Sequence, residues 1–229
     1  MQALVYHGPQ HKTLEDRPKP TVQVPSDAIV KVTKTTICGT DLRILKGDVA
    51  TCKPGTILGH ECGVLNGKVQ PGSTVAIVGS GPIGLAALLT AQFYSPSEII
   101  MIDLDANRLD VAKRFGATAT VNSADGNAAQ QVMTLTGGRG VDTAIEAVGI
   151  PATLELCQDI VAAGGNIANI GVHGAKVDLH LERLWSHNVT ITTRLVDTVS
   201  IPMLLKTVQA RRIDAKLLIT HRFKLGEIL

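Results

Sequence analysis

The sequence predicts an α/β protein with a doubly wound parallel sheet, preceded by a shorter all-β portion. Between Thr74 and about residue 215, short apolar runs bounded by glycine or aspartate alternate with stretches of helical spacing, which is typical of βαβ units. One of these runs leads into a glycine-rich turn that begins at Gly79. The first 61 residues instead contain β-like runs separated by prolines. We therefore expect two regions of different architecture.

The predicted strands and helices follow from these runs and from the residues that bound them. We expect the strands of the parallel sheet at 75–78, 98–102, 117–121, 142–147, 166–170 and 189–195. A helix begins after Asp105, whose side chain is a suitable N-cap, and ends near Gly116; another begins at Pro151 and stops at Gly164 and Gly165. In the N-terminal portion we expect β-structure at 4–6, 28–32 and 35–38.

The glycine-rich turn predicts a dinucleotide site. It has the pattern G-x-G-x-x-G and comprises Gly79, Ser80, Gly81, Pro82, Ile83 and Gly84. The first glycine permits a tight turn out of the strand, the second lets backbone N–H groups approach a pyrophosphate, and the third lets helix and strand pack closely. A βα turn that binds nothing can carry the same glycines, so the motif by itself leaves that alternative open.

The next predicted strand ends in a carboxylate that favours NAD as the dinucleotide. Asp103 lies 19 residues after Gly84, where a Rossmann fold needs an acid that accepts hydrogen bonds from the adenosine ribose hydroxyls. The 2′-phosphate of NADP would meet a like charge there. We therefore expect NAD rather than NADP.

Composition excludes several other classes of function. The chain has 229 residues, 45% of them apolar, and 22 basic against 20 acidic residues give a net charge of +2. This charge is too small and too dispersed to indicate nucleic acid or a membrane surface as a partner. The N-terminus lacks the features of a signal peptide and no segment is long and apolar enough to span a bilayer, so we expect a cytoplasmic protein.

A second group of chemistry-bearing residues lies in the β-like portion. Cys38-Gly-Thr-Asp41 and Gly59-His60-Glu61 bring a thiol, a hydroxyl, an imidazole and carboxylates together in the sequence. Cysteine and histidine suit Zn²⁺, and a catalytic zinc site has three protein ligands and an open position. However, an isolated cysteine is more often a small core residue, so composition leaves zinc binding and a purely structural role equally open.

Several motifs, taken in order, resemble those of the medium-chain zinc-dependent alcohol dehydrogenases. They are the two sequences just named, the glycine-rich turn, the segment from Gly140 to Gly149, and Leu218-Ile-Thr-His-Arg-Phe223. The resemblance implies a partial GroES-like catalytic domain at 1–61, an NAD-binding Rossmann domain at 62–215, and a truncated return to the catalytic domain at 216–229. It also implies a small alcohol or aldehyde substrate and a homo-oligomer, either a dimer or a tetramer.

The same resemblance assigns roles to individual residues. Cys38, His60 and Glu61 resemble the ligands of the catalytic zinc, Asp41 the acid that orients the ligand imidazole, and Thr40 the hydroxyl of a proton relay. Arg108 resembles the basic residue at the adenosine ribose. Further cofactor contacts implied by the resemblance are Val148, Ile170, Gly171 and Val172.

This chain departs from the family pattern immediately after Glu61. The sequence that would carry a structural zinc lobe and a further ligand of the catalytic zinc is absent there, so we expect no structural zinc and a weak catalytic zinc site. The hypotheses that remain are a shortened alcohol dehydrogenase with compromised activity, a noncatalytic NAD-binding module, and a zinc-independent reductase of the same superfamily.

Overall fold

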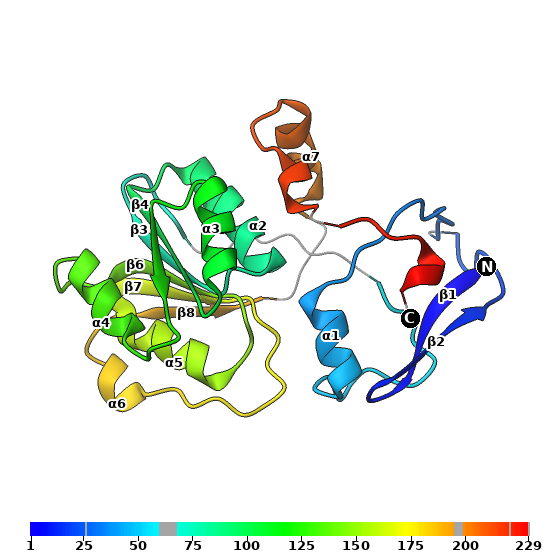
Figure 1. Ribbon diagram of the computed structural model, residues 1–229, viewed down its shortest axis with the longest axis horizontal. Helices are drawn as coiled ribbons and strands as arrows, with labels where there is room; N and C mark the ends of the chain where they lie inside the picture. The colour runs from blue at the N-terminus through cyan, green and yellow to red at the C-terminus, as the bar shows by residue number, and fades with distance from the viewer. Residues whose placement is uncertain (26, 60–67, 195–198, 220, 229) are drawn as a thin grey trace. The chain divides into compact units, whose positions relative to one another are not determined.

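The chain forms two compact units. The computed structural model describes residues 1–25, 27–59, 68–194, 199–219 and 221–228 (Figure 1). One unit comprises Met1–Glu61 and His221–Leu229, and the other comprises Cys62–Thr220.

The larger unit is built around a parallel sheet of six strands in the order β5-β4-β3-β6-β7-β8. The strands are β3 (Thr74–Val78), β4 (Glu98–Asp103), β5 (Ala119–Asn122), β6 (Val141–Glu146), β7 (Val161–Asn169) and β8 (Thr190–Thr193). The chain runs outward from β3 through β4 to β5, then crosses back to β6 on the other side of β3. This is the strand order of a doubly wound fold, with its switch point between β3 and β6. The predicted fold class is confirmed.

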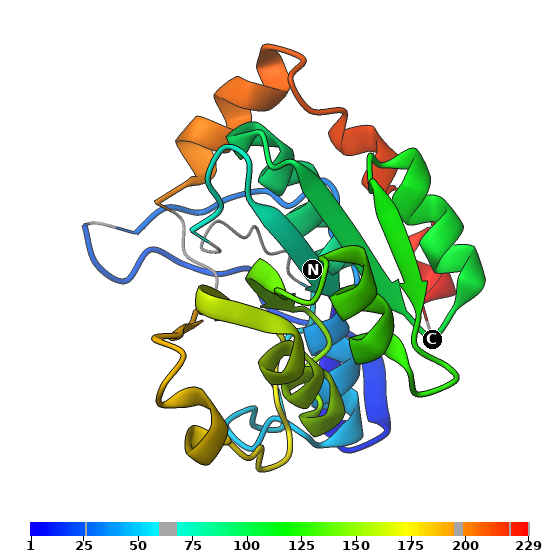
Figure 2. The same ribbon diagram turned by 90° about the vertical axis from the view of Figure 1, so that its left-hand side faces the viewer.

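Helices cover both faces of this sheet (Figures 1 and 2). They are α2 (Pro82–Ala91), α3 (Ala106–Arg114), α4 (Ala128–Leu135), α5 (Pro151–Ile160) and the short α6 (Leu181–Leu184). A further helix, α7 (Ile201–Gln209), has no buried residue. Short 3₁₀ helices lie at η1 (Gln92–Tyr94) and η2 (Ala215–Leu218). In the part of the chain that the structure describes, no helix is long and apolar enough to cross a membrane.

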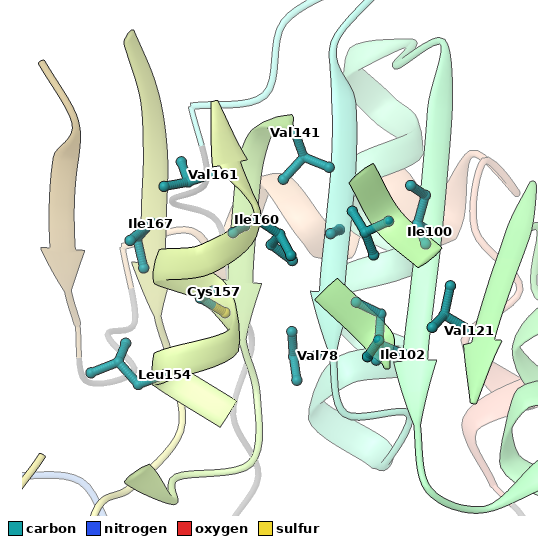
Figure 3. Close-up of a cluster of buried hydrophobic side chains, with 14 of the residues drawn as sticks. Val78, Ile100, Ile102, Val121, Val141, Leu154, Cys157, Ile160, Val161 and Ile167 are labelled. Atoms are coloured by element: carbon teal, nitrogen blue, oxygen red, sulfur yellow. The ribbon is translucent and has the colours of Figure 1, made fainter. Parts of the chain in front are cut away.

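Two buried clusters hold these layers together, because side chains alternate between the two faces along each strand. Val78, Ile100 and Ile102 pack with α4 and α5 on one face, and Figure 3 shows Leu154, Cys157 and Ile160 of α5 in this cluster. Ile77 and Met101 point to the other face, where they pack with α2 and α3. The central strands β3 and β4 are buried on both faces, so they appear in the sequence as continuous apolar runs.

The predicted helix after Asp105 is confirmed as α3, and a hydrogen bond explains where it begins. The Asp105 carboxylate accepts the backbone N–H of Asn107 at 2.8 Å, which satisfies one of the donors that a helix N-terminus leaves without an intrahelical partner.

The smaller unit contains an antiparallel hairpin of β1 (Gln2–Gly8) and β2 (His11–Asp16), the helix α1 (Gly39–Lys46), and the 3₁₀ helix η3 (Leu225–Glu227). Segment 55–58 runs beside β1: the N–H of Tyr6 donates to the carbonyl of Thr56, and the N–H of Leu58 donates to that of Leu4, both at 2.9 Å. This arrangement buries Val5, Tyr6 and Leu58.

Three sequence-based predictions of elements are wrong. The runs at 28–32 and 35–38 are not strands: among the described residues neither has a neighbouring strand, and Val30 and Val32 are 76% and 72% exposed. A β-like composition cannot form a ladder without a partner. The helix from Pro151 ends at Ile160, and β7 begins at the next residue. Gly164 and Gly165 therefore lie within β7, in the stretch where its register with β6 shifts.

Candidate dinucleotide site

The candidate site lies at the carboxyl ends of β3, β4, β6 and β7, around the switch point of the sheet. Neighbouring connections leave β3 and β6 in opposite directions there, and open α/β sheets bind ligands in the crevice at such a switch point. Val78, Asp103, Glu146 and Asn169 are the last residues of these strands. The side chains in the next turns therefore decide what the crevice can hold.

The glycine-rich turn connects β3 to α2, and its glycines are required by close approaches. Gly79 has a φ of +104°, and a Cβ there would lie 2.6 Å from Cγ2 of Val148. A Cβ on Gly84 would lie 1.8 Å from the carbonyl oxygen of Gly79. Helix α2 thus packs directly against the turn, and no larger residue fits at these two positions.

The middle of the turn is open rather than closely packed, which fits a bound pyrophosphate. A Cβ on Gly81 would meet nothing within 4 Å, and Gly81 is the N-cap of α2, with Pro82 and Ile83 in its first turn. The N-terminus of a helix favours an anion. The buried hydroxyl of Ser80 has no hydrogen-bond partner among the described residues, as expected of a group whose partner is a ligand.

Asp103 lies at the end of β4, and its carboxylate is joined to the glycine-rich turn. Its Oδ2 accepts the backbone N–H of Ser80 at 2.7 Å, and its Oδ1 accepts the N–H of Asp105 at 3.0 Å. The side chain is 9% exposed. An ionised carboxylate has about four acceptor positions, so two remain for hydroxyl groups of a ligand.

Arg108 projects from α3 toward the same carboxylate. Its Nη1 lies 4.0 Å from Oδ2 of Asp103, and its Nε lies 4.0 Å from Oδ2 of Asp105. The Arg108 side chain is 59% exposed, so both ion pairs are solvated and weak. The guanidinium is free to turn toward a ligand beside Asp103.

The remaining predicted cofactor contacts lie in the loops that follow β6 and β7. The side chain of Val148 lies against the backbone of Gly79, where it leaves no room for a Cβ. A Cβ on Gly149 would lie 2.2 Å from the carbonyl oxygen of Val172. The structure thus places Val148, Ile170, Gly171 and Val172 at one end of the sheet with the glycine-rich turn.

Glu146 is a residue of this region that sequence reasoning missed. It is the last residue of β6 and its side chain is fully buried. Burial and the nearby charge of Glu146 raise the pKa of the Cys157 thiol on α5, so that thiol is a neutral core group. The signal in the sequence was a lone acid in the apolar run Ala144-Ile-Glu-Ala-Val148, since buried acids are rare without partners.

In the smaller unit, Cys38 precedes α1 and is 2% exposed. The Asp41 carboxylate accepts the backbone N–H of Cys38 through Oδ2 at 2.8 Å and that of Gly59 through Oδ1 at 3.2 Å. The Cys38 thiol lies 3.7 Å from the hydroxyl of Thr40. Asp41 thus holds the two predicted motif segments together.

The predicted zinc ligands are only partly described. His60 and Glu61 lie outside the described residues, so Cys38 is the one predicted ligand with a known position. Among the residues that the structure describes, no group of three histidine, cysteine, aspartate or glutamate side chains could hold a metal ion. The zinc prediction therefore rests on the sequence.

Comparisons with known proteins agree with this geometry. The family model described as zinc-binding dehydrogenase matches residues 82–209. The structure of zinc dependent alcohol dehydrogenase 2 from Streptococcus pneumonia is 41% identical and has a TM-score of 0.94, covering 100% of this chain and 92% of that one. An NADP-dependent isopropanol dehydrogenase from Thermoanaerobacter brockii is 36% identical over 68% of this chain and 46% of its own length.

A comparison of lengths adds a further observation. An alcohol dehydrogenase from Cupriavidus necator is 25% identical over an alignment of 343 residues, which covers 100% of this chain and 93% of the relative. This chain has 229 residues. The relative therefore has a large amount of sequence within the aligned span that has no counterpart here.

Proposed function

Because the chain belongs to the zinc-binding dehydrogenase family, we propose that it binds NAD at the switch point and transfers hydride between a small alcohol or aldehyde and the nicotinamide. The observation that carries the proposal is the Asp103 carboxylate, which is hydrogen-bonded to the glycine-rich turn at the end of the neighbouring strand. In the proposal, this carboxylate accepts from the ribose hydroxyls beside the turn that takes the pyrophosphate.

In this proposal, different residues of the site bind different parts of the cofactor. The open backbone at Gly81 and the N-terminus of α2 take the pyrophosphate, and the buried Ser80 hydroxyl gains a partner there. Asp103 accepts from the adenosine ribose, and Arg108 lies against that ribose. The loop 170–172 and Val148 support the nicotinamide half. Bound nicotinamide supplies the hydride chemistry, and the protein holds and orients it.

The choice of NAD over NADP follows from charge. A 2′-phosphate would approach the Asp103 carboxylate, which is nearly buried and cannot turn away from its two backbone donors. The negative charges of the phosphate and the carboxylate would repel each other. The alternative is that Arg108 binds the phosphate, as its 59% exposure permits, and the T. brockii relative is named as NADP-dependent.

Zinc enters the proposal through Cys38, together with His60 and Glu61. A bound zinc ion would act as a Lewis acid on the substrate oxygen, and Thr40, next to Cys38, would pass the proton toward solvent. The second candidate function is a noncatalytic NAD-binding module, which the missing length within the C. necator alignment favours.

The decisive experiment on the adenosine side is calorimetric titration of NADH into the full chain and into Asp103→Ala. We expect the substitution to weaken NADH binding by about tenfold or more, the loss that accompanies removal of a charged hydrogen-bond acceptor. Glu98→Ala, at the opposite end of β4, is the matched control and leaves the affinity unchanged. Unchanged affinity in Asp103→Ala would refute the ribose assignment.

An assay separates the candidate functions. The purified chain is mixed with NAD, short alcohols and added zinc, and NADH absorbance is followed with and without chelator. Turnover that the chelator abolishes supports the dehydrogenase, turnover that survives it supports a zinc-independent reductase, and NADH binding without turnover supports the noncatalytic module.

A further inference from the structure

A buried carboxylate joins two loops at the switch point. Oε1 of Glu146 accepts three hydrogen bonds, from the N–H of Val148 at 2.9 Å, the N–H of Gly149 at 2.8 Å and the hydroxyl of Thr153 at 2.7 Å. One oxygen of this side chain therefore fixes both the loop after β6 and the first turn of α5.

The other side of the same residue faces the loop after β7. The Glu146 carbonyl accepts the N–H groups of Ile170 and Gly171 at 2.9 and 3.1 Å. A Cβ on Gly171 would lie only 2.2 Å from Oε2, so the loop passes directly over the carboxylate. Glu146 thus contacts both loops on which the nicotinamide half is proposed to rest.

His173 is the group that faces Oε2. Its Nε2 lies 3.4 Å from Oε2 of Glu146 and 2.8 Å from Oδ1 of Asn169. The amide nitrogen of Asn169 donates to the carbonyl of Gly171 at 3.2 Å, so Oδ1 is the acceptor that remains for His173. This network assigns a proton to Nε2 of His173, which donates it to Oδ1 of Asn169.

Burial explains why this pair is needed. Glu146 is 0% exposed and the His173 side chain is 14% exposed. Oε2 has no hydrogen-bond partner at normal distance in the described residues. A buried carboxylate without compensation is costly. Among the described residues, the Cys157 thiol also lies near Glu146 and is kept neutral by burial, and the ring of His173 is the polar group that faces Oε2.

We propose that Glu146 and His173 form a positioning pair that holds the loop 170–172 against Gly149 and thereby sets the site of the nicotinamide half. The inference rests on the proposed function, because it assigns the pair to one half of the same cofactor site. Neither side chain needs to touch the cofactor: each acts through the loop that it holds.

The test compares a ligand that has a nicotinamide with one that lacks it. NADH and ADP-ribose are titrated calorimetrically into the full chain and into Glu146→Gln, His173→Leu and His173→Gln. The amide of Glu146→Gln presents a donor to the donor on His173. We expect NADH affinity to fall about tenfold, because the loop 170–172 is no longer held in place, and ADP-ribose affinity to stay unchanged.

The histidine variants show whether a hydrogen-bond donor at position 173 is responsible. His173→Leu should weaken NADH binding as Glu146→Gln does, and His173→Gln, which keeps a donor, should restore most of the affinity. Glu155→Gln is the matched control, because it removes the same charge from an exposed position on α5. Thermal unfolding shows which variants are folded, and the partly exposed His173 carries the test if Glu146→Gln does not fold.

The outcomes separate the two proposals. Wild-type protein that binds neither NADH nor ADP-ribose would refute the proposed function and the role of the pair with it. Wild-type protein that binds both, with folded variants that leave NADH affinity unchanged or lower both affinities equally, would refute the positioning pair alone.

Discussion

The two units of the chain differ in what fixes their candidate functional residues. In Cys62–Thr220, buried clusters on both faces of the sheet fix the strand ends that carry Asp103 and Glu146. In the unit formed by Met1–Glu61 and His221–Leu229, the Asp41 carboxylate accepts the N–H groups of Cys38 and Gly59. Packing therefore sets the positions of the strand ends at the cofactor site, whereas the geometry around Cys38 depends on a few polar contacts.

The smaller unit also leaves much apolar surface exposed. Large apolar side chains that are at least 47% exposed lie along 22–37, namely Val22, Val24, Ile29, Val30, Val32 and Ile37. Substitutions in this stretch should cost little stability, because its side chains gain little from burial in the folded chain.

The largest expected difference between the units is in the effect of truncating an apolar side chain. Ile100→Ala should lower the free energy of unfolding by about 2–5 kcal/mol, because it leaves a cavity at a fully buried position. Val30→Ala is the matched control and should change it by less than about 0.5 kcal/mol. Urea denaturation followed by circular dichroism measures both, and similar losses in the two variants would contradict the comparison.

A smaller effect is expected from removing the Asp41 carboxylate. Asp41→Ala leaves the N–H groups of Cys38 and Gly59 without this acceptor, at a cost of about 1–3 kcal/mol. Asp48→Ala is the control in the same unit, because it breaks only the partly exposed ion pair with Arg43 and costs less than about 1 kcal/mol.

The Asp41 variant also sharpens the functional side of the comparison. NADH affinity should be unchanged in Asp41→Ala, because the cofactor site is built from residues of the other unit. A calorimetric titration that finds weaker NADH binding in the folded variant would show that the cofactor site depends on the smaller unit.

The sequence predicted the larger unit well because its signals are local. The apolar runs that became β3 and β4 are buried on both faces, and the Asp105 cap marks the start of α3. Gly84 is required by a contact within the turn itself, and Gly79 has a positive φ that favours glycine. Each of these features depends on a few residues that are close in the sequence.

The failures involve residues whose environment is set by distant parts of the chain. The runs at 28–32 and 35–38 have the composition of strands, but a strand depends on a neighbour. Glu146 is the last residue of β6 and His173 lies in the loop after β7. No local sequence pattern predicts that these two residues pair. The roles assigned to His60 and Glu61 stay predictions, since both residues lie outside the described part of the chain.

The central claim is that Asp103 makes the switch point of the larger unit a site for NAD. Calorimetric titration of the unmodified chain with NADH and, separately, with NADPH tests it most directly. We expect NADH to bind at least about tenfold more tightly, since the 2′-phosphate meets a nearly buried carboxylate. Equal affinities, or tighter binding of NADPH, would contradict it.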